Sequence, residues 1–262
     1  MNIFLHEIKQ GLRSLCVCTL TISSFMIICI LIFPDMTGET VNIGDMMSSM
    51  GIFAQAFSLD VIDFGSLKGY YAIECGNIIG IGGALFASLL GIAALAKEEG
   101  AHTAEFLFSH PVTRNRVITE KLLSVFAQII FLNVVVFVAC IFSMLFIGES
   151  IFWKELVLLH VAYFLSQLAI ASICFLFSSL LNSSNFGLGL GFALILYFLN
   201  LIAKITESAS FLKYLTPFSF AESSDIIQYS KINVQYFIPS CIIAIISLAL
   251  SYFIYNKKDL RT

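Results

Sequence analysis

Residues 156–203 have the sequence LVLLHVAYFLSQLAIASICFLFSSLLNSSNFGLGLGFALILYFLNLIA, and this stretch decides the fold. It runs for 48 residues without Asp, Glu, Lys or Arg. A membrane-spanning helix needs about 20 apolar residues, because its backbone polar groups must be satisfied inside the segment. One helix of this length would reach roughly 72 Å at about 1.5 Å per residue. The cluster Asn182-Ser183-Ser184-Asn185 favours a turn, so the stretch predicts two spans.

Four further long stretches carry no charged side chain, and they lie at 14–34, 75–96, 122–148 and 232–256. Of the 262 residues, 59% are hydrophobic and 12% are charged, whereas a soluble domain has about 25% charged residues. The alternating pattern of a membrane β-strand is absent from the sequence. The sequence predicts an all-α polytopic membrane protein with a single transmembrane domain over 1–262. Its six spans are expected near 14–33, 74–96, 122–147, 156–181, 186–204 and 235–255.

The basic residues predict which side of the membrane the termini occupy. An even number of spans places both termini on one side, and cytoplasmic loops are enriched in Lys and Arg. With both termini cytoplasmic, nine of the 14 Lys and Arg residues lie inside, including every Arg. We therefore expect a multi-pass protein of the cell (plasma) membrane, surrounded by the lipid bilayer, with cytoplasmic N- and C-termini.

The N-terminal region leaves two interpretations open. Residues 1–13 are amphipathic, which fits either a helix in the plane of the cytoplasmic surface or an early extension of the first span. No small-x-small cleavage site precedes Pro34-Asp35, and the apolar run is longer than that of a usual signal peptide. The first span is therefore expected to be a retained anchor.

Two outer segments are long enough to carry structure of their own. The segment 205–234 is predicted to form two short helices with a hinge near Thr216-Pro217. In the loop 35–73, apolar residues recur at steps of three or four, which predicts a helix with one apolar face. That face would pack on the bundle, lie on the outer leaflet or contact a substrate. The residues of the face are Met46, Met50, Phe53, Phe57, Val61 and Phe64.

The largest cytoplasmic segment, 97–121, differs from a simple connecting loop. Its first part is predicted to form a short helix that ends before Pro111. Three consecutive large apolar residues, Phe106, Leu107 and Phe108, lie in that part although they are beyond the membrane. Such a patch predicts a surface that docks into a partner protein, and the alternative is that it dips into the lipid interface.

The chain lacks the sequence motifs of an ATPase or a metalloenzyme. No Gly-x-x-x-x-Gly-Lys-Ser/Thr sequence occurs, so this chain cannot hydrolyse ATP by that route. The four histidines include no His-Glu-x-x-His motif, and the seven cysteines fall within or beside the predicted spans. We expect no catalytic residue, no metal, no cofactor bound by this chain and no nucleic-acid partner.

Small and polar residues inside the spans predict contacts between helices. Glycines in the second and fifth spans would allow close packing at a dimer contact or along a pathway. These are Gly76, Gly80, Gly83, Gly187 and Gly191. Polar residues within spans either form interhelical hydrogen bonds or serve the function. These are Gln128, Asn133, His160, Gln167 and Asn200.

Residues 97–123 resemble a loop of the permease subunits of type-2 ABC exporters. In that family the loop after the second span reads approximately Glu-x-x-x-Gly-Thr-x-Glu-x-Leu-x-x-x-Pro-Val-x-Arg and runs into Lys-Leu-Leu. His102 stands where the family commonly has Gly. Weaker likenesses are Tyr214-Leu215-Thr216-Pro217-Phe218 and the C-terminal Tyr255–Leu260. The loop residues that fit are Glu98, Glu99, Thr103, Glu105, Leu107, Pro111, Val112, Arg114, Lys121, Leu122 and Leu123.

The resemblance implies the transmembrane subunit of an ATP-driven exporter. Such permeases pair with a second copy or a paralogue and bind two ABC ATPase subunits, which hold the ATP and Mg. A coupling helix at about 98–110 would contact the ATPase, and the path would run along spans two and five. The implied coupling residues are Glu98, Glu99, Thr103, Glu105, Phe106, Leu107, Phe108, His110, Pro111 and Arg114.

Two other functions compete with this one. An ion-coupled secondary transporter usually needs a titrating group inside the membrane, and no charged residue is predicted near the bilayer centre. An intramembrane protease would use the adjacent glutamates Glu98 and Glu99, but no following Arg and no pair of histidines in a span completes that set.

Overall fold

The computed structural model describes residues 3–37, 51–58, 62–101, 103 and 112–258. Throughout these ranges the regular elements are helices, and six are long and apolar enough to cross a membrane. The second combines α4 (Leu67–Tyr70), the π-helical turn η1 (Tyr71–Cys75) and α5 (Gly76–Ala93). The other five are α1 (Ile3–Thr37), α8 (Arg114–Phe146), α9 (Trp153–Leu180), α10 (Phe186–Ile205) and α12 (Val234–Lys257). The predicted six-helix, all-α fold is confirmed.

The 48-residue apolar stretch divides where its sequence predicts. α9 ends at Leu180 and α10 begins at Phe186. The side chain of Asn185 caps α10, since its Oδ1 accepts a hydrogen bond from the backbone N–H of Leu188 at 3.1 Å. The Asn and Ser residues between the two helices thus end one span and start the next.

α1 decides between the two interpretations of the N-terminal region. The helix runs unbroken from Ile3 to Thr37 over 35 residues. At about 1.5 Å per residue it is roughly 52 Å long, whereas the hydrocarbon core of a bilayer is about 30 Å thick. The amphipathic residues at the start of the chain are therefore an extension of the first span, and the separate in-plane helix is wrong.

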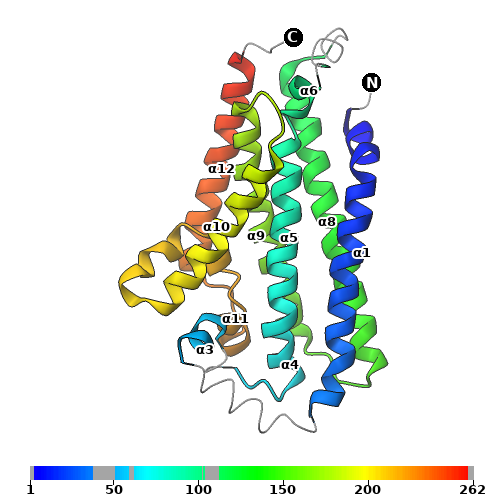
Figure 1. Cartoon of the computed structure of the whole chain (residues 1–262), viewed down its shortest axis with the longest axis vertical. Coiled ribbons are helices and arrows are strands. Elements are labelled where there is room, and N and C mark those ends of the chain that lie inside the picture. Colours follow the sequence, from blue (N-terminus) through cyan, green and yellow to red (C-terminus); the bar gives the residue numbers. More distant parts are fainter. Residues whose placement is uncertain (1–2, 38–50, 59–61, 102, 104–111, 259–262) are drawn as a thin grey trace.

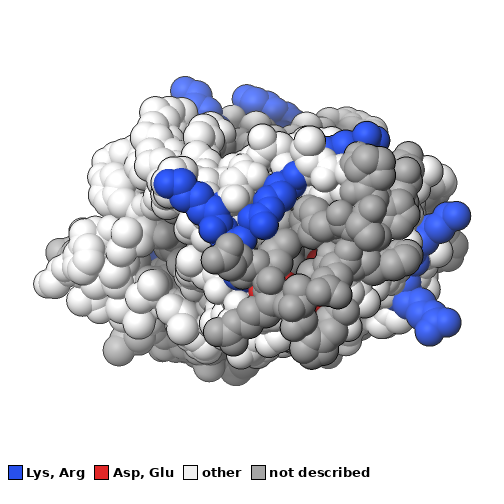
Figure 2. Space-filling view, turned by 90° about the horizontal axis from the view of Figure 1, so that it is seen from above, with Lys and Arg blue, Asp and Glu red and all other residues white. Residues whose placement is uncertain are grey.

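The bundle has two distinct ends (Figure 1). α1 begins and α12 ends at the same end, which we call the terminal end and which also carries α6 (Lys97–Gly100). The opposite, distal end carries α3 (Ile52–Phe57), α4 and α11 (Ser223–Tyr229). Seen from the terminal end, Lys and Arg side chains project outward, and only small areas of Asp and Glu show between them (Figure 2).

α5 is the central helix of the bundle. It packs on α9, with α10 and α1 on its flanks, while α8 packs on α1 and α12 packs on α9. Glycine permits the closest approach, because a Cβ atom at Gly91 would lie 2.6 Å from the backbone oxygen of Ala171. Two helices therefore meet backbone to backbone, as small residues allow inside a membrane.

The helix predicted within 35–73 is shorter than expected. α3 ends at Phe57, and Ser58 has a φ of 58°, in the left-handed region where a helix cannot continue. Phe64 is buried but lies outside any helix, so the prediction of one helix through Phe64 is wrong. The predicted face residues Met46, Met50 and Val61 lie outside the described residues.

The segment 205–234 also differs from its prediction. Two short helices were expected, and the segment forms two 3-10 helices, η2 (Glu207–Tyr214) and η3 (Pro217–Ser219), followed by α11. The predicted break near Pro217 is confirmed, because this residue occupies the first position of η3, where a missing backbone N–H is tolerated. The segment folds back along α10 and thereby positions the distal cluster described below.

Candidate functional site

A network of ion pairs at the terminal end is centred on Lys121 of α8. Its Nζ donates hydrogen bonds to the backbone oxygen of Ala94 at 2.8 Å and to Glu7 Oε1 at 3.1 Å, and it also contacts the carboxylate of Glu98. The Lys121 side chain is only 1% exposed, and lysine is almost never buried without such partners. One ammonium group thus joins α1, the end of α5, α6 and the start of α8.

Glu7 on α1 extends this network. One of its carboxylate oxygens pairs with Lys121, and the other pairs with Lys97 of α6. Lys97 also donates to Gln10 Oε1 at 2.6 Å. The extension of α1 beyond the first span therefore brings a buried carboxylate between two lysines that flank the 97–121 segment.

A second group of contacts ties the end of α12 to the same region. Lys258 Nζ forms an ion pair with the buried Glu99 at 2.7 Å. The guanidinium of Arg114 donates to backbone oxygens at the end of α12 and at Lys258, the residue that follows it, where carbonyl groups lack partners within the helix. These contacts are with Tyr255 at 3.1 Å, Asn256 at 3.0 Å and Lys258 at 2.6 Å.

The structure places four of the ten predicted coupling residues. Glu98, Glu99 and Arg114 belong to the network, and the hydroxyl of the exposed Thr103 donates to the backbone oxygen of Glu98 at 3.4 Å. Because Glu98 and Glu99 are each paired with a lysine, they do not form the free carboxylate pair that a protease would need. The other six lie outside the described residues: Glu105, Phe106, Leu107, Phe108, His110 and Pro111.

Sequence reasoning missed the partners that hold these residues. Lys121 matched the family loop but was not among the predicted coupling residues, and neither Glu7 nor Lys97 was. One signal was available, because Glu7 is an acidic residue in a first segment that is otherwise basic. Its contact with Lys121 spans 114 positions of sequence, which no local pattern reveals.

The predicted glycines of α5 pack against α9. A Cβ atom at Gly76 would lie 2.6 Å from the hydroxyl oxygen of Tyr163, and one at Gly80 would lie 3.3 Å from the Tyr163 ring. A Cβ at Gly83 would lie 2.0 Å from Gln167 Nε2. These three glycines therefore serve contacts within the chain.

The predicted glycines of α10 behave differently. Gly189, between them, packs on α5, where its Cβ would lie 2.9 Å from Ile92 Cγ2. At Gly187 the nearest atom to a Cβ would be Oδ1 of Asn185, at 3.4 Å, and Asn185 belongs to the turn just before α10. At Gly191 no atom of the described chain lies within 4 Å of that position. This face of α10 is therefore open in the single chain.

Polar residues in the middle of the spans form hydrogen bonds between helices. Asn133 Nδ2 donates to Gln167 Oε1 at 2.6 Å, and Gln167 Nε2 donates to the backbone oxygen of Ile79 at 3.4 Å. His160 Nε2 lies 2.7 Å from the hydroxyl of Tyr71. For Asn133, Gln167 and His160 the structure therefore supports the first alternative, hydrogen bonding between helices.

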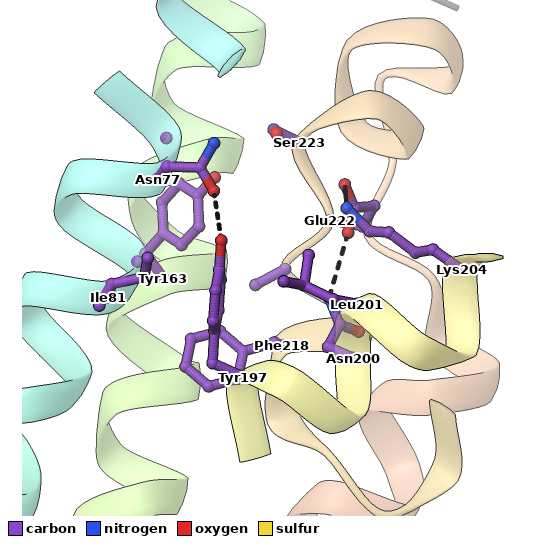
Figure 3. A pocket seen from close by; sticks show the side chains of 13 residues that line it. Asn77, Ile81, Tyr163, Tyr197, Asn200, Leu201, Lys204, Phe218, Glu222 and Ser223 are labelled. Atoms are coloured by element: carbon purple, nitrogen blue, oxygen red, sulfur yellow. Dashed lines mark hydrogen bonds and ion pairs between the residues drawn. The ribbon is translucent and has the colours of Figure 1, made fainter. Parts of the chain in front are cut away.

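A second polar cluster lies at the distal end, between α5, α9, α10 and the chain that follows α10 (Figure 3). Lys204, in the last turn of α10, forms an ion pair with Glu222 at 2.7 Å. Asn200, one turn earlier, donates to Glu222 Oε2 at 3.5 Å and accepts from Ser219 Oγ at 2.8 Å. The cluster lines a partly open cavity of about 30 Å³, which has room for roughly one or two water molecules.

Tyr197 connects this cluster to α5. Its hydroxyl donates to Asn77 Oδ1 at 3.3 Å, and its ring meets the edge of Phe218 with centroids 5.6 Å apart (Figure 3). Tyr163 of α9 lines the cavity from the opposite side. Phe218 belongs to the weaker family likeness, and among the polar residues of this cluster the sequence singled out only Asn200, although its spacing of four from Lys204 places both on one face of the helix.

Six apolar helices and two polar clusters at opposite ends define a polytopic helical membrane protein. The chain belongs to the ABC-2 family of transporter proteins, since the family model described as "ABC-2 family transporter protein" matches residues 1–260. This membership confirms the resemblance to the permease subunits of type-2 ABC transporters. Among curated proteins, none matches the chain.

Proposed function

We propose that this chain is the transmembrane subunit of an ATP-driven exporter in the plasma membrane. It pairs with a second copy or a paralogue, and two ABC ATPase subunits bind at its terminal end. The ATPases hold the ATP and Mg, and the terminal end faces the cytoplasm. Family membership and the resemblance of residues 97–123 to a coupling loop support this proposal.

The observation that carries the proposal is the burial of Lys121 at the base of the 97–121 segment. Its contacts connect that segment to α1 through Glu7 and to α5 through Ala94. On the other side, Glu99 connects the segment to α12 through Lys258. Because Lys121 and Glu99 are buried and ion-paired, a push on the segment would be transmitted through them to the ends of α1, α5 and α12.

The pathway in this proposal runs beside α5 and α10, the second and fifth spans. α5 has its glycine contacts with α9, so it is held firmly inside the chain. The open face of α10 at Gly187 and Gly191 fits a close contact with a second permease, because small residues let two helices approach.

The proposal is tested at the predicted docking patch. Replacing Leu107 by Asp puts a charge where an apolar contact with the ATPase is expected, so the ATPase should no longer copurify or be stimulated. We expect at least a tenfold loss of complex, because burying an unpaired charge in an interface is strongly unfavourable. The matched control, Leu107→Met, keeps the apolar volume and should retain the complex. Unchanged binding and stimulation with the Asp variant would refute the assignment of this segment.

A further inference from the structure

A second cavity lies near the terminal end of the bundle, between α1, α5 and α8, which run side by side in Figure 1. Phe186, the first residue of α10, completes its wall. The cavity is partly open and has a volume of about 430 Å³, far larger than the distal cavity. Sites that hold small molecules typically measure several hundred Å³. A single chain therefore builds a cavity of ligand size.

The cavity has one polar side and one apolar side. Glu7, Gln10 and Ser14 of α1 recur at steps of three and four, so they lie on one face of that helix and form the polar side. Lys97 joins them, since its Nζ contacts the Glu7 carboxylate and donates to Gln10 Oε1 at 2.6 Å. The apolar side is formed by α5, α8 and α10. Its members include Leu89, Leu90, Ala93, Val125 and Phe186.

The charges beside this cavity balance one another. Of the described residues that line it, Glu7 and Lys97 carry charge, and they form an ion pair. The second oxygen of Glu7 pairs with Lys121, which also pairs with Glu98. A ligand with a net charge would have to compete with these buried partners, which is costly. The cavity therefore suits a polar group that carries no net charge.

Gln128 of α8 offers an unused hydrogen-bond acceptor at the same cavity. Its Nε2 donates to the backbone oxygen of Ser124 at 3.2 Å, while its buried Oε1 has no partner among the described residues. The residue is 4% exposed, and its Oε1 lies close to Gly11 of α1, because a Cβ there would be 2.4 Å away. A buried amide oxygen normally accepts a hydrogen bond, since leaving it unpaired is unfavourable. A donor on a molecule in the cavity would satisfy it.

We propose that this cavity binds one amphipathic molecule from the half of the bilayer next to the terminal end. Its polar part carries no net charge and includes a hydroxyl, which donates to Gln128 Oε1. An acceptor on the same part meets Lys97, because Glu7 and Gln10 engage only two of the three N–H groups of its Nζ. The apolar part of the molecule lies against Leu90 and Ala93.

Two sources can supply this chemistry, a resident single-chain lipid and a transported amphiphile. The binding site itself is a property of this chain alone. Only the question of whether the bound molecule is exported rests on the proposed function.

The first experiment tests binding with the purified permease in nanodiscs of phosphatidylglycerol. The probe is lysophosphatidylcholine, a single-chain zwitterionic lipid with one free hydroxyl, carrying a photoreactive diazirine in its acyl chain. After illumination, mass spectrometry should find saturable crosslinks to the cavity segments 89–94 and 124–128. Phe131 and Phe142 are exposed on α8, so their crosslinks should rise in proportion to the probe concentration and report non-specific lipid contact.

Two variants with the same change separate the cavity from the lipid-facing surface. Ala93→Phe fills the cavity, so saturable crosslinking should fall at least about tenfold. Ala249→Phe places the same ring at an exposed position of α12 and should leave crosslinking unchanged. The absence of saturable crosslinks in the parent chain, or their persistence in Ala93→Phe, would overturn the site.

The second experiment removes the assigned hydrogen bond from either side and does not depend on filling the cavity. Gln128→Leu should weaken binding of the probe about three- to tenfold, as expected for the loss of one hydrogen bond. A probe whose hydroxyl is replaced by hydrogen should bind the parent chain equally weakly, and Gln128→Leu should not distinguish the two probes. Additive losses, or no loss in Gln128→Leu, would overturn the bond between the hydroxyl and Gln128.

A third experiment adds the cognate ATPase and distinguishes the two sources. A transported amphiphile should stimulate ATP hydrolysis, and trapping with ATP and vanadate should lower its crosslinking in the cavity. A resident lipid should crosslink to the same extent in both states and leave hydrolysis unchanged. If no ATPase binds the chain, the proposed function fails, while crosslinking of the permease alone still decides whether the site exists.

Discussion

The two polar clusters of this bundle use the same kind of ion pair in different surroundings. At the terminal end Lys121 is 1% exposed and is shared by acceptors on three elements. At the distal end Lys204 is 16% exposed and its pair with Glu222 borders a small cavity. A fully buried ammonium is costly to separate from its partners, whereas a partly exposed one regains some hydration when its partner is lost. The two ends therefore differ in the burial of the lysine at the centre of each cluster.

The largest expected effect comes from removing the lysine of each cluster in turn. Lys121→Met leaves Glu98 and Glu7 partly uncompensated in a buried site, which should lower the free energy of unfolding by about 3–5 kcal/mol. Lys204→Met should lower it less, by about 1–3 kcal/mol, because the Lys204 side chain is 16% exposed and has fewer acceptors than Lys121. Reversible unfolding of the permease in detergent measures both.

The control for this comparison lies on the same helix as Lys121. Arg116 is 59% exposed and pairs with Glu120 at 2.7 Å one turn away, so Arg116→Gln should change stability by no more than about 0.5 kcal/mol. Equal losses in the free energy of unfolding for Lys121→Met and Lys204→Met would contradict the expected difference between the two clusters.

The next effect tests whether helix packing is also stiffer toward the terminal end. A Cβ at Gly91 would meet the backbone oxygen of Ala171 at 2.6 Å, whereas one at Gly76 would meet the far end of the Tyr163 side chain. A backbone atom cannot move without its helix, so Gly91→Ala should destabilise by about 1–3 kcal/mol. Gly76→Ala should lose less than about 1 kcal/mol, since the tyrosine can shift.

Gly191 supplies the reference for both alanine variants. No described atom lies within 4 Å of a Cβ at this position, so Gly191→Ala should stabilise the isolated chain by up to about 1 kcal/mol through helix propensity. The same unfolding measurement applies to all three. A larger loss at Gly76 than at Gly91 would mean that the distal half of α5 is the rigid one.

The number of spans was predictable because it depends on local composition, whereas the helices at Ile3, Leu67 and Arg114 begin before the spans predicted near 14, 74 and 122. Residues 156–203 had to divide, since one helix of that length would far exceed a bilayer, and Asn185 both breaks the apolar run and caps the next helix. The absence of charge marks a span in any tertiary context. The six spans were therefore predictable, because the need to cross the apolar core of the bilayer excludes charge from the middle of each of them.

The polar clusters were harder to predict because their members are far apart in sequence. The contact between Glu7 and Lys121 joins residues 114 positions apart, and that between Tyr197 and Asn77 joins residues 120 apart. The helix predicted through Phe64 failed for a different reason. Apolar spacing at three and four persists through Ser58, but the backbone there turns left-handed and ends the helix.

The smallest expected effect concerns Asp225, an acidic residue near Glu222 in the distal cluster. Burial raises the pKa of Asp225 on α11, and the nearby Glu222 raises it further, while Lys213, Asn233 and Lys204 lower it in part. A carboxyl whose pKa is higher in the folded state than in the unfolded state binds its proton more tightly when folded. Its contribution to stability is therefore lost as pH rises from the usual value of about 3.8 through the raised value.

Asp225→Asn should remove this loss. Near pH 3 the variant and the parent should unfold at the same temperature, because Asp225 is protonated in both states, and at pH 7 the variant should unfold at a slightly higher temperature. This result would sharpen the comparison of the two ends. An ionised Asp225 repels Glu222 at the distal end, whereas each glutamate of the terminal network is paired with a lysine. A lower unfolding temperature for the variant at pH 7 would mean that the lysines outweigh burial and repulsion. The distal end would then be as fully compensated as the terminal end.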